Sequence, residues 1–383
     1  MQIVADVNIP NVEQAFGTLG DVQLLPGRAI GRDEVREADL LLVRSVTTVG
    51  PALLDGSHVR FVGSATIGLD HVDEAYLRTR GISLAYAPGS NANSVAEYVI
   101  AALLELGPLR YEGRTLGIVG LGRIGTLACE KARALGMTVL ANDPPLERAG
   151  RSELIALDDL VRRSDIVTLH VPFTRDGPDA SYHLLDESRL SLLQRHAVVV
   201  NTARGAVVDN EALLRALRDG RLGGAVLDVW EGEPEPDPSL VQAVTLGTSH
   251  IAGYSFDGKV TGTKMLYEAA CAFLNRLPEW SPPALPSDAN CLPVEIDPSR
   301  SLDEILCDLV PRSYDIRRDD AALRAIAELP SPERGWAFDR LRAEYPRRLE
   351  FRNTAVVVPP DRPELRSPLA GLGFTAIISG RKG

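Results

Sequence analysis

The chain has 383 residues, of which 45% are hydrophobic and 24% are charged, a balance typical of a globular protein with two or three domains. Its formal net charge of −11 argues against nucleic acid as a partner, and an anionic substrate would need a local positive pocket. The longest apolar stretch, 98–104, is too short to cross a bilayer, so we expect no membrane partner.

The first ninety residues alternate short apolar runs with turn-rich segments, a pattern typical of a parallel sheet with helices on its faces. The predicted strands are Gln2–Val7, Leu40–Val43, Arg60–Ser64 and Ile82–Tyr86. The segments Val12–Leu19 and Asp73–Arg80 have helical spacing. Because a strand begins almost at residue 1, we expect no signal peptide and a cytoplasmic protein.

A helix is predicted over Ser94–Leu106, with Gly107-Pro108 as its stop signal, and a second alternating series follows. Its predicted strands are Thr115–Val119, Thr138–Ala141, Ile166–Leu169, Ala197–Asn201, Gly224–Val229 and Val244–Leu246. Six strands alternating with helices predict a second doubly wound parallel sheet.

The pattern of predicted elements changes in the last part of the chain. A helix from Lys259 to about Leu277 is followed by a proline-rich linker, 278–286. Beyond the linker, three helices and one strand predict a small α+β module without a catalytic motif. These elements are Leu302–Leu309, Ala321–Leu329, Trp336–Tyr345 and the strand Arg348–Val358.

The four cysteines lie at positions 129, 271, 291 and 307, with no C-x-x-C spacing. This pattern favours reduced thiols over disulfides or a zinc site, so no metal is expected.

A glycine-rich loop follows the strand Thr115–Val119 and opens a helix. Gly120, Gly122 and Gly125 form a G-x-G-x-x-G pattern, which lets the backbone turn tightly and approach a pyrophosphate at the helix N-terminus. Asp143, 18 residues after Gly125, ends the next strand, where a ribose-binding carboxylate belongs. No arginine for a 2′-phosphate is near Asp143. The pattern therefore predicts NAD as the cofactor.

Arg204, Glu233 and His250 each follow one of three successive predicted strands. The carboxyl ends of parallel strands converge on the ligand crevice, so these side chains are expected to meet there. An arginine can hold a substrate carboxylate, and a histidine paired with a glutamate can take a hydroxyl proton. Each also has a structural explanation, as a surface arginine, an exposed acid or a core histidine. His170, at the end of another strand, is the alternative histidine.

Seven motifs in this order resemble those of the D-isomer-specific 2-hydroxyacid dehydrogenase family, over roughly residues 1 to 280. They are Asn93–Glu97, Gly120–Gly125, Leu169–Thr174, Asn201–Gly205, Leu227–Val229, Glu233-Pro234 and His250–Gly253. The resemblance implies that Arg204 orients the substrate, and that His250 paired with Glu233 is the acid and base. It also implies an NAD-lining set: Gly120, Gly122, Arg123, Ile124, Gly125, Asp143, Thr174, Thr202, Ala203, Asp228 and Gly253.

The same resemblance implies three domains: a substrate-binding lobe (1–91 and 256–281), an NAD-binding Rossmann domain (92–255), and a C-terminal domain (285–383) that makes a homodimer. The active site is expected in the cleft between the first two. The C-terminal module and the sequence after His250 resemble family members that act on a small phosphorylated 2-hydroxy acid. Ser45, Thr66 and Tyr254 would then contact substrate, with Arg44 or Lys259 as basic neighbours for the phosphate.

Three alternatives remain open at this point. The substrate could be another D-2-hydroxy acid, such as 3-phosphoglycerate. The chain could be a non-catalytic NAD-sensing protein on the same fold. The C-terminal module could bind a regulatory ligand instead of forming a dimer.

Overall fold

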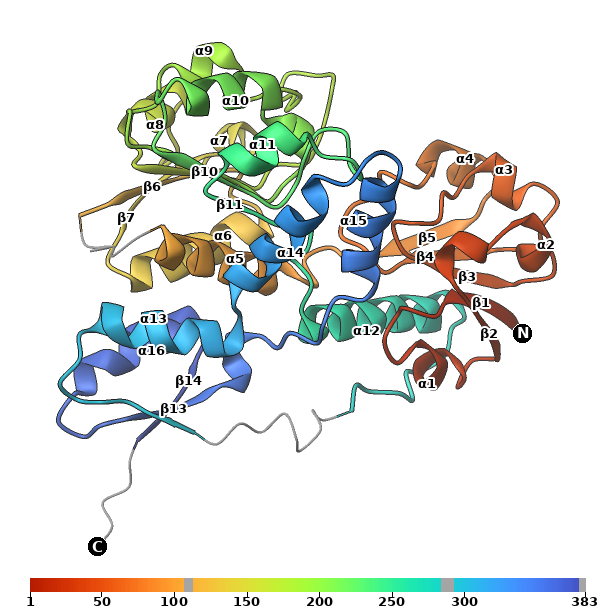
Figure 1. Ribbon diagram of the computed structural model, residues 1–383. Helices are drawn as coiled ribbons and strands as arrows, with labels where there is room; N and C mark the ends of the chain where they lie inside the picture. The colour runs from red at the N-terminus through yellow and green to blue at the C-terminus, as the bar shows by residue number, and fades with distance from the viewer. Residues whose placement is uncertain (107–112, 284–292, 379–383) are drawn as a thin grey trace, which may run out of the picture. The chain divides into compact units, whose positions relative to one another are not determined.

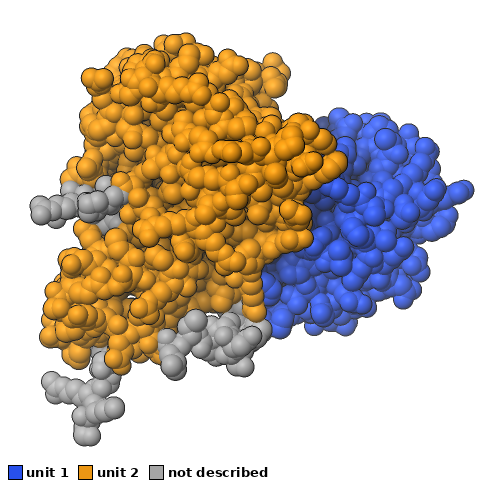
Figure 2. All heavy atoms as spheres, in the orientation of Figure 1, with its two compact units in different colours: residues 1–91, 255–286 blue, residues 92–254, 287–383 orange. Residues whose placement is uncertain are grey.

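The computed structural model describes residues 1–106, 113–283 and 293–378, and the chain divides into two compact units (Figure 2). Unit 1 comprises residues 1–91 and 255–286, and unit 2 comprises residues 92–254 and 287–383. Over the described ranges, no helix is both long and apolar enough to cross a lipid bilayer. Gly107, Pro108, Pro286 and Cys291, which figure in the predictions above, fall outside these ranges.

Unit 1 contains a five-stranded sheet in the order β2-β1-β3-β4-β5, and every neighbouring pair is parallel. The strands are β1 (Gln2–Asp6), β2 (Asp21–Leu25), β3 (Leu40–Val43), β4 (Phe61–Ser64) and β5 (Ser83–Tyr86). This order is flavodoxin-like, which confirms the first predicted doubly wound lobe. The edge strand β2 is absent from the predicted elements, because Asp21 and Gln23 interrupt its apolar pattern and only one neighbour covers it.

The helices of unit 1 are α1 (Val12–Phe16), α2 (Arg32–Val35), α3 (Pro51–Leu54), α4 (Glu74–Thr79) and α12 (Phe256–Phe273). The long helix α12 begins at Ser255, whose Oγ accepts the N–H of Gly258 at 2.8 Å and so caps the helix. Buried Tyr267 of α12 meets Phe16 edge to face, with ring centroids 5.7 Å apart. The late helix α12 thus completes the core of the first sheet.

Unit 2 contains a six-stranded parallel sheet in the order β11-β10-β9-β8-β6-β7 (Figure 1). Its strands are β6 (Thr115–Val119), β7 (Thr138–Asn142), β8 (Ile166–Leu169), β9 (Val198–Asn201), β10 (Gly224–Leu227) and β11 (Leu246–Gly247). The second predicted doubly wound sheet is therefore confirmed. The predicted start of the last strand at Val244 is wrong, because the Val244 N–H bonds to the helical carbonyl of Leu240 instead of a strand.

The helices that accompany this sheet are α5 (Ala92–Glu105), α6 (Arg123–Ala134), α7 (Pro144–Arg148), α8 (Leu157–Arg163), α9 (Glu187–Leu190), α10 (Asn210–Arg218) and α11 (Pro238–Ala243). Helix α5 is buried along almost its whole length, from Ala92 to Leu104. Such a helix is covered by other elements on all its faces, and part of that cover comes from the end of the chain.

The C-terminal residues of unit 2, here called the extension, run from residue 293 to 378 among the described residues. The extension has a three-stranded parallel sheet, β12-β13-β14, and four helices, so the predicted α+β region is present. Its elements are β12 (Val294–Glu295), α13 (Leu302–Ser313), α14 (Ile316–Ala327), α15 (Glu333–Ala343), β13 (Ala355–Val358), α16 (Arg366–Leu372) and β14 (Thr375–Ile378).

The predicted strand Arg348–Val358 is wrong over most of its length, since only Ala355–Val358 pairs in the sheet. Arg348 and Glu350 are buried and make contacts with α5 in place of strand pairing. An Nη of Arg348 donates to the Ser94 carbonyl at 2.8 Å, and Glu350 accepts the Ser94 hydroxyl at 2.9 Å. Charged side chains at these positions stay buried only because such partners are present.

A buried polar cluster joins the extension to α5 and α6. Glu97 of α5 accepts the N–H of Phe351 at 3.0 Å, and Lys131 of α6 donates to the Leu372 carbonyl at 2.6 Å. Burial raises the pKa of the Glu97 carboxyl to about 7, although the charges of Lys131 and Arg348 lower it. The extension therefore meets the second sheet's helices through polar contacts as well as apolar ones.

Helices α14 and α15 add side chains to the core of the second sheet. Leu323, Ala327 and Phe338 are buried in one apolar cluster with Trp230 and Leu240. Because protein interiors are close-packed, a helix that buries a phenylalanine in this core has little freedom to move relative to it. The end of the chain is thus packed into unit 2, next to the loops that follow β10 and β11.

Replacing Phe338, which is 0% exposed, with alanine should lower the free energy of unfolding of unit 2 by about 3–5 kcal/mol. Trp336 of the same helix is 68% exposed, so its replacement with alanine should change stability by no more than about 0.5 kcal/mol. Urea denaturation of both variants measures the difference. Equal, small losses would show that α15 is not packed into this core.

Candidate active site

The glycine-rich loop joins β6 to α6 with backbone geometry that requires glycine. Gly120 has φ +91°, and a Cβ at Gly125 would lie 2.0 Å from the Gly120 carbonyl oxygen. Gly122 is the N-cap residue of α6, and no side chain caps the helix. Nothing lies within 4 Å of the place where a Cβ on Gly122 would be. The first-turn N–H groups of this twelve-residue helix are therefore suited to a pyrophosphate. Arg123 and Ile124 follow as its first residues.

Asp143 lies directly after β7 and is tied to the glycine-rich loop. One carboxylate oxygen accepts the N–H of Leu121 at 2.9 Å, and the other accepts the N–H of Leu146 at 3.0 Å, which caps α7. The carboxylate is therefore held beside the loop, at the strand end where a ribose hydroxyl would be bound. The residues present fit a dinucleotide with an unsubstituted ribose.

Arg204 lies on the loop after β9, and the side chain of Asn201 shapes that loop. The Asn201 amide donates to the Arg204 carbonyl at 2.9 Å and accepts the N–H of Ala203 at 3.0 Å. A Cβ at Gly205 would lie 2.0 Å from the carbonyl carbon of Trp230, so this position admits only glycine. The arginine is thus fixed against the loop that carries Glu233.

His250 and Glu233 form a hydrogen-bonded pair. Nδ1 of His250 lies 2.7 Å from Oε2 of Glu233, and the other glutamate oxygen accepts the N–H of Trp230 at 2.9 Å. Burial raises the pKa of Glu233, but the histidine charge and the hydrogen bonds outweigh it, so the net pKa lies below its usual value. An ionised glutamate fixes the proton on Nδ1 and leaves Nε2 to accept a proton. The predicted pair is therefore brought together.

Asp228 organises the loop on which His250 lies. Its carboxylate is 2% exposed and accepts the Thr248 hydroxyl at 2.6 Å and the N–H groups of Ile251 and Ala252 at 2.7 and 2.9 Å. The His250 N–H donates to the Asp228 carbonyl at 2.7 Å, and His250 itself has φ +57°. A left-handed conformation at a non-glycine residue persists only when its surroundings hold it. The assignment of Asp228 to the cofactor stays a prediction beside this structural role.

A second network, absent from the predictions, joins the loops of Arg204 and Glu233. Asn210 donates its side-chain amide to the Gly205 carbonyl, and its backbone N–H bonds to Glu231 at 3.1 Å. Glu231 also lies 2.7 Å from Nε2 of His183. Together with Asp209, these two form the one described group whose ligand types and spacing could hold a metal ion. Neither Asn210, at the start of α10, nor His183 lies in a motif that signals this role.

His170, the alternative histidine, is unsuited to proton transfer. Burial lowers the pKa of its imidazole to about 3, so the ring stays neutral at physiological pH. Its nitrogens face the hydroxyls of Thr168 and Thr202 at 3.0 and 3.3 Å, and no carboxylate among the described residues pairs with it. The preference for His250 therefore has a physical basis.

The remaining predicted cofactor residues lie on loops at the carboxyl edge of the second sheet. Thr174 follows β8, and its N–H donates to the Ser181 hydroxyl at 2.8 Å. Thr202 and Ala203 follow β9 and are nearly buried, and Gly253 lies in the turn after His250. The structure therefore gathers these loops, while contact with a cofactor stays a prediction.

The predicted substrate residues fall on both units. Ser45 is exposed after β3, and Thr66 follows the adjacent strand β4, where its hydroxyl bonds to that of Ser64 at 2.7 Å. Both therefore lie at the same edge of the first sheet. Tyr254, in unit 2, meets Tyr345 of the extension edge to face at 5.7 Å and lies near Arg342.

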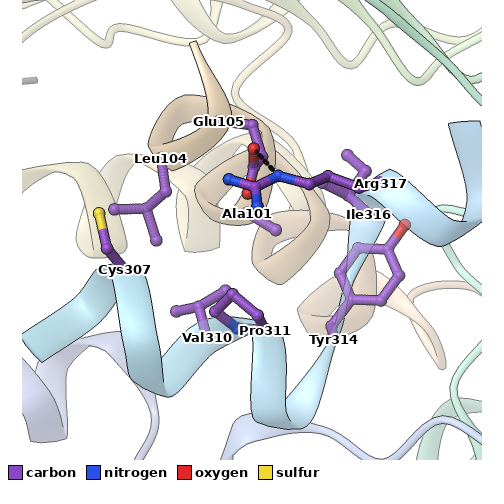
Figure 3. Close-up of a pocket in the computed structure, with 9 residues that line it drawn as sticks. All are labelled: Ala101, Leu104, Glu105, Cys307, Val310, Pro311, Tyr314, Ile316 and Arg317. Atoms are coloured by element: carbon purple, nitrogen blue, oxygen red, sulfur yellow. Dashed lines mark hydrogen bonds and ion pairs between the residues drawn. The ribbon is translucent and has the colours of Figure 1, made fainter. Parts of the chain in front are cut away.

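Figure 3 shows a groove of about 290 Å³ between α5, α13 and α14, across which Arg317 pairs with Glu105. Apolar residues such as Leu104 and Val310 line it together with this charged pair. No predicted site residue contributes to it.

Comparisons with known proteins agree with this geometry. Residues 98–252 match the D-isomer specific 2-hydroxyacid dehydrogenase NAD binding domain, and residues 289–373 match a domain of unknown function. The chain is 52% identical to the erythronate-4-phosphate dehydrogenase of Salinibacter ruber, over 93% of this chain and 94% of that one. It is 44% identical to that of Cellvibrio japonicus, over 98% and 100%.

Among solved structures, the chain is similar to the D-lactate dehydrogenase of Aquifex aeolicus complexed with NAD and lactic acid. That structure has a TM-score of 0.62 and 25% identity, and the match covers 72% of this chain and 96% of that one.

Replacing Asp228 with asparagine should lower the free energy of unfolding by about 1.5–3 kcal/mol, because an amide NH₂ would face the N–H of Ile251 or Ala252. Displacement of the His250 loop should also reduce kcat about a hundredfold. Asp237→Asn is the control, since asparagine caps α11 as well as aspartate does. Thermal unfolding and steady-state rates measure both effects. Wild-type behaviour of the first variant would remove Asp228 from this role.

Proposed function

The chain belongs to the erythronate-4-phosphate dehydrogenases of the D-isomer-specific 2-hydroxyacid dehydrogenase family, and we propose that it oxidises 4-phospho-D-erythronate at C2. The product is 3-hydroxy-2-oxo-4-phosphooxybutanoate, in the biosynthesis of pyridoxal 5′-phosphate. The observation that carries this proposal is the 2.7 Å pair of His250 and Glu233 at the same sheet edge as the glycine-rich loop. Such a pair is suited to taking the proton of a hydroxyl while its carbon is oxidised.

The two side chains divide the work of proton transfer. Glu233 accepts a hydrogen bond from Nδ1–H of His250, so Nε2 can take the proton of the C2 hydroxyl as the carbonyl forms. The ionised glutamate stabilises the imidazolium that results. Arg204 holds the C1 carboxylate with its guanidinium fork and orients C2. Bound NAD supplies the acceptor of the hydride that leaves C2.

NAD is the cofactor, and we assign its pyrophosphate to the loop Gly120–Gly125 and its ribose to Asp143. A carboxylate at that position repels the 2′-phosphate of NADP. We further assign Thr174, Thr202, Ala203, Asp228 and Gly253 to the walls of the cofactor site.

The double variant Asp143→Ala with Pro144→Arg tests the role of Asp143. The ratio of kcat/KM for NAD to kcat/KM for NADP should be lower in this variant than in the wild type.

Ser45, Thr66 and Tyr254 are the proposed contacts for the hydroxyl groups and phosphate of the substrate. 3-Phosphoglycerate, another phosphorylated 2-hydroxy acid, is the second candidate substrate. A purely NAD-sensing role is disfavoured, because sensing requires neither the His250–Glu233 pair nor the neutral tautomer that it fixes.

We also propose a cytoplasmic homodimer that forms through the extension. Helices α13 and α16 lie on one side of its sheet (Figure 1), and buried Val356 and Val358 belong to the same apolar cluster as residues of both helices. The neighbouring Val357 and Ile377 are paired in register, and Ile377 is 40% exposed. An apolar pair on an open sheet face is suited to a second copy of the chain. Analytical ultracentrifugation tests this, and a monomer at micromolar concentration contradicts it.

Purified protein should reduce NAD with 4-phospho-D-erythronate much faster than with 3-phosphoglycerate or D-lactate. His250→Asn should lower kcat about 10²–10⁴-fold, the usual contribution of a general base. His196→Asn is the matched control, because His196 also pairs with a carboxylate, Asp165 at 2.7 Å, but is half exposed on the surface. The steady-state rate of NADH formation, followed by absorbance, is measured for the wild type and for both variants. No turnover of 4-phospho-D-erythronate by the wild type would overturn the proposal.

A further inference from the structure

Arg342, on the extension helix α15, lies near Tyr254, four residues after His250, although it belongs to no predicted site. Its guanidinium carbon is 5.9 Å from the centroid of the Tyr254 ring, and the side chain is only 17% exposed. Its positive charge also acts on Glu233, which bonds to His250. A nearly buried arginine is rare without a partner that matches its fork of donors.

The guanidinium of Arg342 hydrogen-bonds to the Tyr254 side chain, and its ion pairing with the protein is weak. The nearest carboxylate recorded for it, Asp339 on the same helix, is 4.0 Å away, the outer limit of an ion pair. Its Nε is buried and has no hydrogen-bond partner among the described residues. A buried donor left unpaired costs about 1–3 kcal/mol, and more when it is charged. Because this Nε is shielded from solvent, an anion can reach Arg342 only through its Nη groups.

Helix α15 is fixed against the loop that carries Glu233. Arg334 pairs with Glu235 at 3.6 Å, and a Cβ on Gly335 would lie 3.0 Å from the Glu235 side chain. Gly335, Phe338 and Arg342 are spaced three and four residues apart, so they lie on one face of the helix. Since Phe338 is anchored in the core, the position of Arg342 is set by a rigid element.

We infer that Arg342 binds the phosphate group of the substrate. This assignment rests on the proposed function, in which Arg204 holds the carboxylate at the other end of the same molecule. A chain with net charge −11 needs a local cation to receive a phosphate dianion. Arg342 offers a planar fork suited to two phosphate oxygens, next to Tyr254, which is itself a proposed substrate contact. The extension thereby contributes to substrate specificity as well as to assembly.

Kinetics with and without the phosphate test this role. Arg342→Gln should raise KM for 4-phospho-D-erythronate about tenfold to a hundredfold, the loss expected for a charge-assisted hydrogen bond. Its kcat/KM for D-erythronate, which lacks the phosphate, should stay within about threefold of wild type. Arg340→Gln, at an exposed position on the same helix, is the matched control and should behave as wild type with both acids.

Two results overturn the inference: equal losses with both acids, which assign Arg342 to support of Glu233, or no loss with either. If circular dichroism shows that Arg342→Gln does not fold, Arg342→Lys is compared with the wild type on the same two acids. Lysine keeps the positive charge but loses the planar fork of donors. Calorimetry of inorganic phosphate binding to the NAD-loaded protein is independent of turnover. Weaker binding in the variant supports the inference even if wild-type protein fails to oxidise the acid, a failure that counts against the proposed function alone.

Discussion

The carboxylate of Asp228 is the contact on which the rest of the site depends. Asp228 directly follows β10. Its two carboxylate oxygens accept hydrogen bonds from the Thr248 hydroxyl and from the N–H groups of Ile251 and Ala252. These bonds fold the chain after β11 around one buried charge and hold His250 in a left-handed conformation. The histidine then faces Glu233, whose position depends in turn on the Trp230 N–H. The pair proposed as the general base is thus preorganised before any substrate binds.

The end of the chain takes part in this arrangement instead of forming a separate body. Phe338 and Leu323 lie in the core of the second sheet, and Arg348 donates to the carbonyls of Ser94 and Ala252. Ala252 is bound by Asp228 from its other side, so the extension supports the same loop that carries His250. This gives a physical reason for a dehydrogenase of this family to keep an added module: it completes the core and places charged groups near the catalytic pair.

Much of the fold and the catalytic pair could be predicted from the sequence, because parallel sheets leave long apolar runs and bring strand ends to one edge. Elements held by contacts distant in sequence could not be predicted. The edge strand β2 is too polar to match the pattern, and Arg348 and Glu350 turn away from a strand because α5 offers them partners. Arg342 has no motif around it, and only the packing of α15 brings it to Tyr254.

The central claim is that the hydride leaves C2 of a phosphorylated 2-hydroxy acid while His250 takes the hydroxyl proton. Mass spectrometry of the NADH formed from 4-phospho-D-erythronate labelled with deuterium at C2 tests this most directly. The account predicts that the deuterium appears in the NADH and that the labelled acid reacts no faster than the unlabelled one. NADH without deuterium, formed while the labelled acid is consumed, would contradict it.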